Sequence, residues 1–313
     1  MARAGGGGLP WKAVQSLTRR ALLLGACGSA SLAALRRADA LEGTEDLDVR
    51  DLALEGDRTL GRRMTLSVPR HLGAGERAPL LVLLHGLGET GDERAGAWAW
   101  LERYGLGSAY ARLRRPPVVR TSKRADFPED RLRMVNEDLA RAPFRGFVVA
   151  CPYTPNVNKA ANPGAALDGY ARWIAEVVVP RARAEAKCAE GVAMTSIDGC
   201  SLGGFVALEV FLGRPEVFGA LGAVQAAIGK HRAPGYAERF ADVVGRVGAR
   251  GVHVETSTGD PFREANELLA GALAKRGIAH ELLVLPGPHD QPWLREAGTL
   301  EMLRWHDRRF RKV

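Results

Sequence analysis

A serine set between glycines is the sequence feature that most restricts how this chain can fold. Residues 199–203 read Gly-Cys-Ser-Leu-Gly, the pattern G-x-S-x-G, and lie between an apolar run at 192–197 and a predicted helix. In a strand-to-helix turn of this kind, the serine is pushed out above the carboxyl edge of a sheet. A side chain at Gly199 or Gly203 would collide with the neighbouring strand and helix, so both positions require glycine. The pattern predicts a nucleophilic Ser201; the alternative is a glycine-rich turn whose serine takes no part in chemistry.

The rest of the chain alternates apolar runs with helical patterns. Short continuous apolar runs ended by Gly or Pro are typical of strands buried on both faces. The predicted strands are 62–68, 79–84, 146–151, 192–197, 219–224, 252–257 and 279–285. Predicted helices cover 165–187, with a kink at Pro180, and the segment from the serine turn to Leu212; two more begin near Pro261 and near Gln291. This succession predicts an α/β fold with a mostly parallel twisted sheet flanked by helices.

Residues 88–145 interrupt this alternation of predicted strands and helices. The stretch is rich in arginine, and Trp98, Trp100 and Tyr104 lie near its start. Connections of this length usually have a function or carry structure of their own. We expect a partly helical cap or lid, inserted into a single domain at 41–313; the alternative is a solvated surface insertion.

A catalytic serine needs a histidine base and an acid that orients the histidine. His289 follows the last predicted strand, so it can reach the carboxyl edge of the sheet where Ser201 lies. Asp260 follows the strand at 252–257, which gives the chain order serine, acid, histidine. We therefore expect Ser201, Asp260 and His289 to form a catalytic triad. Because Asp260 precedes Pro261, a helix N-cap is the alternative for this residue.

An oxyanion hole is predicted at the same edge of the sheet. His85, Gly86 and Leu87 follow the predicted strand at 79–84. Backbone N–H groups aimed at the position where negative charge develops stabilise the transition state. We expect the N–H groups of Leu87 and Leu202 to be these donors, and His85 to brace the turn rather than act as a base.

With these residues in place, the chain resembles an α/β-hydrolase of the esterase family that includes esterase D, feruloyl esterases and bacterial mycolyltransferases. The resemblance covers roughly residues 60–310 and rests on four segments: Leu84-His85-Gly86 at the oxyanion strand end, Gly199 to Gly204 as G-x-S-x-G-G, Arg214 to Ala220 as the stretch after the serine helix, and His289-Asp290 with Trp293 and Arg295. Arg214 stands where the family usually has histidine, and Pro288 where it often has glycine. The resemblance implies the α/β-hydrolase fold and the same triad of Ser201, Asp260 and His289.

The expected function is a serine-dependent carboxylic ester hydrolase that works through an acyl-enzyme intermediate. Acyl transfer to an alcohol and a hydrolase-like binding protein without turnover are the alternatives. The substrate is expected to be a small-molecule or polysaccharide-linked ester. No metal or organic cofactor is implied, because the sequence has no clustered His/Cys ligand set and no phosphate-binding glycine loop.

Residues 1–40 have the pattern of an export signal. Arg19-Arg20 stands directly before an apolar run of about fifteen residues, which resembles a twin-arginine signal. An Ala-x-Ala site at 38–40 would start the mature chain at Leu41. A lipobox-like segment at 24–27 would instead make a lipidated Cys27 the mature end, and this anchor is the one membrane contact we expect. The protein is thus expected to be exported, to a periplasmic or extracellular location.

The formal net charge of +8 does not indicate nucleic-acid binding. Residues 1–40 hold six basic side chains and one acid, a net of +5, so +3 remains for the other 273 residues. Because most of the excess lies in the predicted signal, we expect no nucleic-acid partner.

Three cysteines remain after the predicted signal, namely Cys151, Cys188 and Cys200. Cys151 ends a strand and Cys188 ends the following helix, so they are expected at opposite edges of the sheet, roughly 20 Å apart. A disulfide requires Cα atoms within about 7 Å of each other. We expect no internal disulfide, with Cys200 packed beneath the serine turn.

Overall fold

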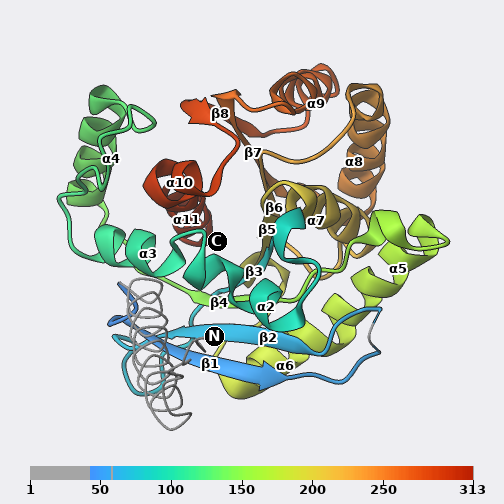
Figure 1. Cartoon of the computed structure of the whole chain (residues 1–313), viewed down its shortest axis with the longest axis horizontal. Helices are drawn as coiled ribbons and strands as arrows, with labels where there is room; N and C mark the ends of the chain where they lie inside the picture. The colour runs from blue at the N-terminus through green and yellow to red at the C-terminus, as the bar shows by residue number, and fades with distance from the viewer. Residues whose placement is uncertain (1–42, 58, 313) are drawn as a thin grey trace, which may run out of the picture. The chain divides into compact units, whose positions relative to one another are not determined.

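A computed structural model of the chain describes residues 43–57 and 59–312 (Figure 1). The predicted export signal at 1–40, with its alternative mature ends at Leu41 and Cys27, lies outside these residues. None of the helices in the described ranges combines the length and the hydrophobicity that a membrane span requires.

An eight-stranded sheet runs through the described residues in the order β1-β2-β4-β3-β5-β6-β7-β8. The strands are β1 (Leu47–Ala53), β2 (Arg63–Pro69), β3 (Leu80–Leu84), β4 (Val148–Pro152), β5 (Thr195–Gly199), β6 (Ala220–Val224), β7 (Gly251–Gly259) and β8 (Glu281–Pro288). β1 and β2 pair antiparallel, β2 pairs antiparallel with β4, and every pairing from β4 to β8 is parallel. The prediction of a mostly parallel sheet is therefore confirmed, with an antiparallel pair added at one edge.

Helices flank this sheet. They are α2 (Glu93–Glu102), α3 (Leu106–Arg114), α4 (Glu129–Arg141), α5 (Pro163–Trp173), α6 (Val179–Glu185), α7 (Leu202–Gly213), α8 (Ala233–Val247), α9 (Arg263–Lys275), α10 (Gln291–Trp293) and α11 (Thr299–Phe310). Short 3-10 segments are η1 (Leu87–Glu89), η2 (Val157–Lys159), η4 (Val192–Met194) and η5 (Lys230–Arg232), and π-helical turns are η3 (Ile174–Val178) and η6 (Leu294–Gly298).

The helix expected at 165–187 consists of three pieces, because Pro180 has no N–H to donate and its ring crowds the preceding turn. α5 passes into the π-helical turn η3, and Pro180 then occupies the first turn of α6. The strand expected at 192–197 begins at Thr195, since residues 192–194 form η4.

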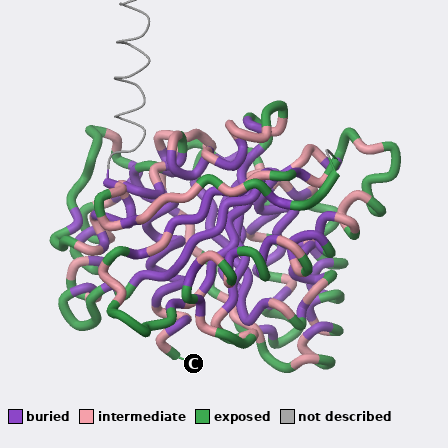
Figure 2. The backbone as a smooth tube through the Cα atoms, turned by 90° about the horizontal axis from the view of Figure 1, so that it is seen from below, coloured by how far each residue is buried: buried purple, intermediate pink, exposed green. Residues whose placement is uncertain are grey.

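The sheet is buried on both faces because its central strands carry two apolar surfaces. Along β3, Leu80, Val82 and Leu84 pack in one cluster with side chains of α5 to α9, whereas Leu81 and Leu83 pack in another with α2, α3, α4 and α11. Figure 2 shows the buried backbone running through the middle of the molecule between exposed connecting segments.

The insertion at 88–145 is helical in part, as predicted, but its first half is not a lid. α2 contacts β2 and β4, and α3 contacts α11. Trp100 is fully buried and Tyr104 nearly so. The aromatic residues at the start of the insertion therefore belong to the helical layer on one face of the sheet.

Cys151, Cys188 and Cys200 are all buried, and none of them forms a disulfide. The prediction of three free thiols is confirmed for these described cysteines. Burial raises the pKa of the Cys151 thiol to about 12 and that of Cys188 to about 11, so both remain protonated and unreactive at neutral pH.

Candidate active site

Ser201 occupies a strained turn between β5 and α7. Its backbone has φ 56° and ψ −118°, a positive φ that non-glycine residues adopt rarely. The Ser201 N–H donates to the Val224 carbonyl at 2.9 Å, which ties the turn to the end of β6. Gly203 N–H donates to the Cys200 carbonyl at 2.8 Å, so the helix begins immediately after the serine.

The two glycines that frame Ser201 are required by close packing, as the sequence predicted. A Cβ atom on Gly199 would lie 2.5 Å from the carbonyl carbon of Gly203. A Cβ atom on Gly203 would lie 2.6 Å from the carbonyl oxygen of His85 at the end of β3. Both distances are below any ordinary van der Waals contact, and the atoms met are backbone atoms that cannot rotate away.

Ser201, His289 and Asp260 meet at the carboxyl edge of the sheet. His289 Nε2 lies 3.0 Å from Ser201 Oγ, and His289 Nδ1 lies 2.8 Å from Asp260 Oδ1. A carboxylate only accepts hydrogen bonds, so the ring proton belongs on Nδ1, and the Nε2 lone pair then faces the serine hydroxyl. The three groups form one hydrogen-bonded chain whose members lie 88 and 29 residues apart in sequence.

Asp260 is held by two further donors, so its carboxylate cannot turn away from His289. Thr256 Oγ1 donates to Oδ2 at 2.6 Å, and the Phe262 N–H donates to Oδ1 at 3.0 Å. The N-cap of α9 is Phe262, two residues after Asp260. Asp260 is therefore not the N-cap of α9, and the helix-cap alternative is wrong. The bond from the Phe262 N–H to Asp260 does order the turn that precedes this helix.

The turn after β3 faces Ser201. A Cβ atom on Gly86 would lie 3.7 Å from the Ser201 Cβ, so the two backbones approach closely. The Gly86 N–H is already bonded to the Tyr104 hydroxyl at 3.3 Å. Among the described residues, no backbone carbonyl outside their own helices accepts the N–H groups of Leu87 and Leu202, and each is the first residue of its helix and so has no partner within it. Both N–H groups are therefore free for a substrate oxygen.

His85 supports this turn and takes no part in the hydrogen-bonded chain. The Thr154 N–H donates to His85 Nε2 at 2.8 Å, so Nε2 is the acceptor nitrogen and Nδ1 carries the proton that the Gly86 carbonyl accepts at 2.8 Å. Complete burial lowers the pKa of His85 to about 4. The residue is therefore a neutral brace, as the sequence predicted.

A cavity of about 310 Å³ opens over Ser201 and His289. Its wall includes the buried Glu89, whose carboxylate accepts from the Tyr104 hydroxyl and from Gln291 Nε2 at 3.4 Å. Glu89, Tyr104 and Gln291 were not among the site residues predicted from the sequence. Glu89 and Gln291 each lie within four residues of a predicted site residue, and this proximity was the available signal.

The loop that carries His289 is fastened from two sides. Gln225, directly after β6 and at φ 48°, donates through Nε2 to Ser257 Oγ at 2.7 Å and to the Pro288 carbonyl at 3.1 Å. Arg124, which belongs to the insertion, forms a bidentate ion pair with Asp290, with N–O distances of 3.0 and 3.2 Å. The second half of the insertion thus touches the residue next to His289.

A second His–Asp pair lies beneath the serine turn. His306 Nε2 of α11 is 2.9 Å from Asp198 Oδ2, and both side chains are completely buried. Asp198 Oδ1 accepts the Gly199 N–H at 2.6 Å, so Asp198 braces the turn. Burial raises the pKa of Asp198, and the bond from His306 opposes that rise.

Next to this pair, Glu255 of β7 is buried without a hydrogen bond to either carboxylate oxygen from any described residue. Burial raises its pKa well above the ordinary value, and the neighbouring Glu301 and Asp198 add to the shift. Arg131 and Arg304 lower the pKa of Glu255, but both are bonded to Glu301.

Within the described residues, no group of three or more His, Cys, Asp or Glu side chains is arranged to hold a metal ion.

Comparison with known proteins identifies the architecture. No protein-family model and no curated protein sequence matches the chain. Solved structures do: a ferulic acid esterase is 18% identical with a TM-score of 0.62, and the match covers 85% of this chain and 99% of that one. The S-formylglutathione hydrolase of Staphylococcus aureus is 13% identical, with a TM-score of 0.56 and coverage of 84% and 98%. Esterase B from Lactobacillus Rhamnosis is 14% identical, with a TM-score of 0.56 and coverage of 96% and 97%.

The chain has the α/β-hydrolase fold. The matched structures are consistent with the family resemblance seen in the sequence, and this chain has the mostly parallel eight-stranded sheet flanked by helices described above. At these identities the likeness concerns the fold, and the chemistry must be argued from the residues of this chain.

Proposed function

We propose that the protein is a serine-dependent carboxylic ester hydrolase with Ser201 as nucleophile, His289 as general base and Asp260 as the acid that orients His289. The observation that supports this most directly is the hydrogen-bonded chain from Asp260 through His289 to Ser201, with distances of 2.8 and 3.0 Å. Nucleophile and base within hydrogen-bond reach, with the base held by a third group, is the arrangement that activates a serine hydroxyl.

The proposed reaction has two halves. Ser201 Oγ attacks the acyl carbonyl while its proton passes to His289 Nε2, and the tetrahedral intermediate collapses when His289 returns that proton to the leaving alkoxide. Water then attacks the acyl-enzyme, with His289 again taking a proton, and releases the carboxylic acid with Ser201 restored. Asp260 balances the charge of the imidazolium that forms in each half.

The N–H groups of Leu87 and Leu202 are the proposed oxyanion donors. Leu202 begins α7, whose N-terminal end favours negative charge, and Leu87 lines the same cavity as Ser201 and His289. Losing one such donor typically costs about 3 kcal/mol of transition-state stabilisation.

We propose an ester of a small molecule or of a polysaccharide as the substrate. A cavity of about 310 Å³ is at the lower end of the range for small-molecule sites, so it suits one acyl group and leaves a large alcohol outside. Several of the matched structures are described as ferulic acid or feruloyl esterases, which makes an ester of ferulic acid a useful member of the first test panel.

The decisive experiment compares Ser201→Ala with Ser108→Ala, the same chemical change on α3 away from the cavity. With p-nitrophenyl acetate, Ser201→Ala should lower kcat by at least about 10³-fold while Ser108→Ala stays at the wild-type rate. A fluorophosphonate label should map to Ser201 by mass spectrometry. Full activity in Ser201→Ala contradicts the proposal, and labelling without turnover on any ester favours the binding-protein alternative. Products esterified to an added alcohol acceptor would favour acyl transfer.

We also propose that residues 1–40 direct export. N-terminal sequencing of the protein from the cell envelope or medium should begin at Leu41, or at an acylated Cys27 if the lipobox-like segment is used. An intact Met1 on exported protein would contradict this proposal.

A further inference from the structure

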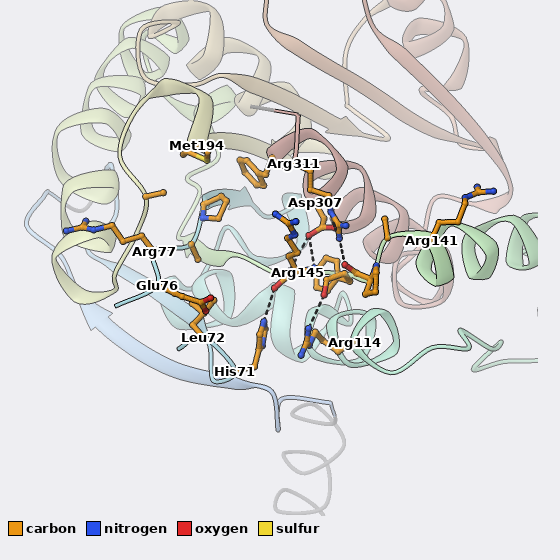
Figure 3. A pocket seen from close by; sticks show the side chains of 18 residues that line it. His71, Leu72, Glu76, Arg77, Arg114, Arg141, Arg145, Met194, Asp307 and Arg311 are labelled. Atoms are coloured by element: carbon orange, nitrogen blue, oxygen red, sulfur yellow. Dashed lines mark hydrogen bonds and ion pairs between the residues drawn. The ribbon is translucent and has the colours of Figure 1, made fainter. Parts of the chain in front are cut away.

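A large recess lies at the amino edge of the sheet, opposite to Ser201. Its wall includes Ala78 and Pro79, which precede β3, and Gly146, which precedes β4, whereas Ser201 follows the carboxyl end of β5. The volume is about 1010 Å³. Five arginines line it, and we call it the arginine recess: Arg77, Arg114, Arg141, Arg145 and Arg311. Figure 3 shows Arg145 and Arg311 beside Asp307, with Arg114 below them and Arg77 and Arg141 toward the two ends.

The charge of the arginine recess is strongly positive. Its wall holds two carboxylates, Glu76 and Asp307, against five guanidinium groups, which leaves a formal charge of +3. Both carboxylates are already engaged by the protein. Asp307 Oδ1 accepts hydrogen bonds from the backbone N–H groups of Arg145 and Gly146 at 3.0 and 3.3 Å. Asp307 Oδ2 accepts a hydrogen bond from the side-chain Nε of Arg311 at 2.9 Å. Glu76 Oε2 accepts the N–H of Gly73 at 2.8 Å.

Arg77, Arg141 and Arg311 each pair with a carboxylate, whereas Arg114 and Arg145 have no carboxylate partner among the described residues. Arg114 is half-buried and donates one N–H to the Phe144 carbonyl at 2.9 Å, while its buried Nε has no partner in the described ranges. The Arg145 guanidinium forms no hydrogen bond or ion pair with any described residue. A guanidinium group has five donors and favours bidentate oxyanions, so these two side chains have most of their bonding capacity left.

The remaining wall holds His71 and otherwise consists of nonpolar residues, Met194 and Phe310 among them. The recess is far larger than a single phosphate or carboxylate group, so a ligand that fills it has an organic body as well as charged groups. We propose that the arginine recess binds a multivalent oxyanion, an organic molecule that carries two or more phosphate or carboxylate groups, with Arg114 and Arg145 as its main contacts.

This site is independent of the proposed ester chemistry. The five residues of β3 separate the two edges of the sheet by about 17 Å, so a ligand in the recess does not touch Ser201 or His289. Substitutions in the recess are expected to leave p-nitrophenyl acetate hydrolysis unchanged, and failure of the proposed esterase activity would leave this inference standing.

Isothermal titration calorimetry of the whole protein tests the proposal with three probes: tripolyphosphate for phosphate, tetragalacturonate for carboxylate, and maltotetraose as a neutral oligosaccharide of similar length. Wild-type protein should bind at least one of the two anions, more weakly as salt increases, and should not bind maltotetraose. The anion that binds more tightly identifies the charged group of the natural ligand. Arg145→Gln should weaken that binding several-fold, and Arg114→Gln with Arg145→Gln by about tenfold or more.

A matched control removes the same charge elsewhere. Arg133 on α4 and Arg276 after α9 are exposed arginines outside the recess, so the double variant Arg133→Gln with Arg276→Gln should bind as the wild type does. If the control variant also bound the anion more weakly, to the same extent, the effect would come from net charge in general and would overturn the proposed site. Absence of binding to both anions, or unchanged binding in a folded Arg145→Gln variant, would overturn it too. Because the Arg145 side chain is exposed and its guanidinium bonds to no described residue, its substitution should not change the melting temperature.

Discussion

Replacing Asp260, the proposed triad acid, by asparagine separates the effect of its negative charge from the effect of its hydrogen bonds. In the structure, the Phe262 N–H and His289 Nδ1 both face Oδ1, so an asparagine side chain is expected to place its oxygen there. Its NH₂ group then faces Thr256 Oγ1, which can accept a hydrogen bond as readily as it donates one. All three contacts of Asp260 survive in this orientation, and the negative charge alone is lost.

The size of the effect follows from the geometry. With the Nδ1–Oδ1 distance of 2.8 Å, the centres of the imidazolium and carboxylate charges are about 4 Å apart. At an effective dielectric constant of about 20, two unit charges at that separation interact by about 4 kcal/mol. The Asp260 side chain is fully buried but that of His289 is 25% exposed, so solvent reduces this figure. We expect Asp260→Asn to lower kcat by about 10² to 10³-fold.

The assay measures kcat and KM on p-nitrophenyl acetate together with thermal unfolding. Asp242→Asn, the same change at an exposed position of α8, serves as the control. The free energy of unfolding of Asp260→Asn should stay within about 1 kcal/mol of the wild type, because no contact is removed. An unchanged kcat would refute the role of Asp260, and a kcat loss accompanied by a large fall in stability would refute the claim that the asparagine keeps all three contacts.

Three further outcomes are expected. Gly203→Ala would place a methyl group 2.6 Å from the His85 carbonyl oxygen, and should lower the free energy of unfolding by about 1–3 kcal/mol in chemical denaturation. Arg124→Gln removes the bidentate ion pair with Asp290 next to His289, the proposed base, and should lower kcat several-fold with little change in KM; an unchanged kcat would show that the loop is held without it. The pKa of Glu255 is raised in the folded state, so its contribution to stability is present below about pH 4.5 and is lost as pH rises. In thermal melts between about pH 4.5 and 8, Glu255→Gln should therefore become increasingly more stable than the wild type. A difference in stability that does not change with pH would contradict this.

Much of the sheet could be predicted from the sequence because continuous apolar runs mark strands that are buried on both faces. Two elements lack such a run and were missed. β1 (Leu47–Ala53) alternates polar and apolar residues at the edge of the sheet, where one face stays partly exposed. α8 (Ala233–Val247) begins with proline in its first turn and buries a narrow apolar stripe, which a search for apolar runs does not detect.

The candidate triad could also be predicted, for a topological reason. Parallel strands end at one edge of a sheet, so residues that follow β5, β7 and β8 are brought together whatever their distance in sequence. The sequence could not show the bonds that hold these residues in place. Gln225 and Arg124 come from two other segments, and no local pattern links them to His289.

The sequence by itself determined the elements that depend on neighbours in the chain: the glycine-framed turn at Ser201, the buried strands and the order of serine, acid and histidine. The tertiary structure alone decided which side chains meet across the fold. The first half of the 88–145 insertion became a core layer because Trp100 and Tyr104 are buried there, and the arginine recess joins Arg114 and Arg145 to Arg311, 166 residues farther along the chain than Arg145. Apolar periodicity and turn residues act over a few positions, whereas burial and charge pairing act between segments whose contact is fixed only when the sheet and helices pack.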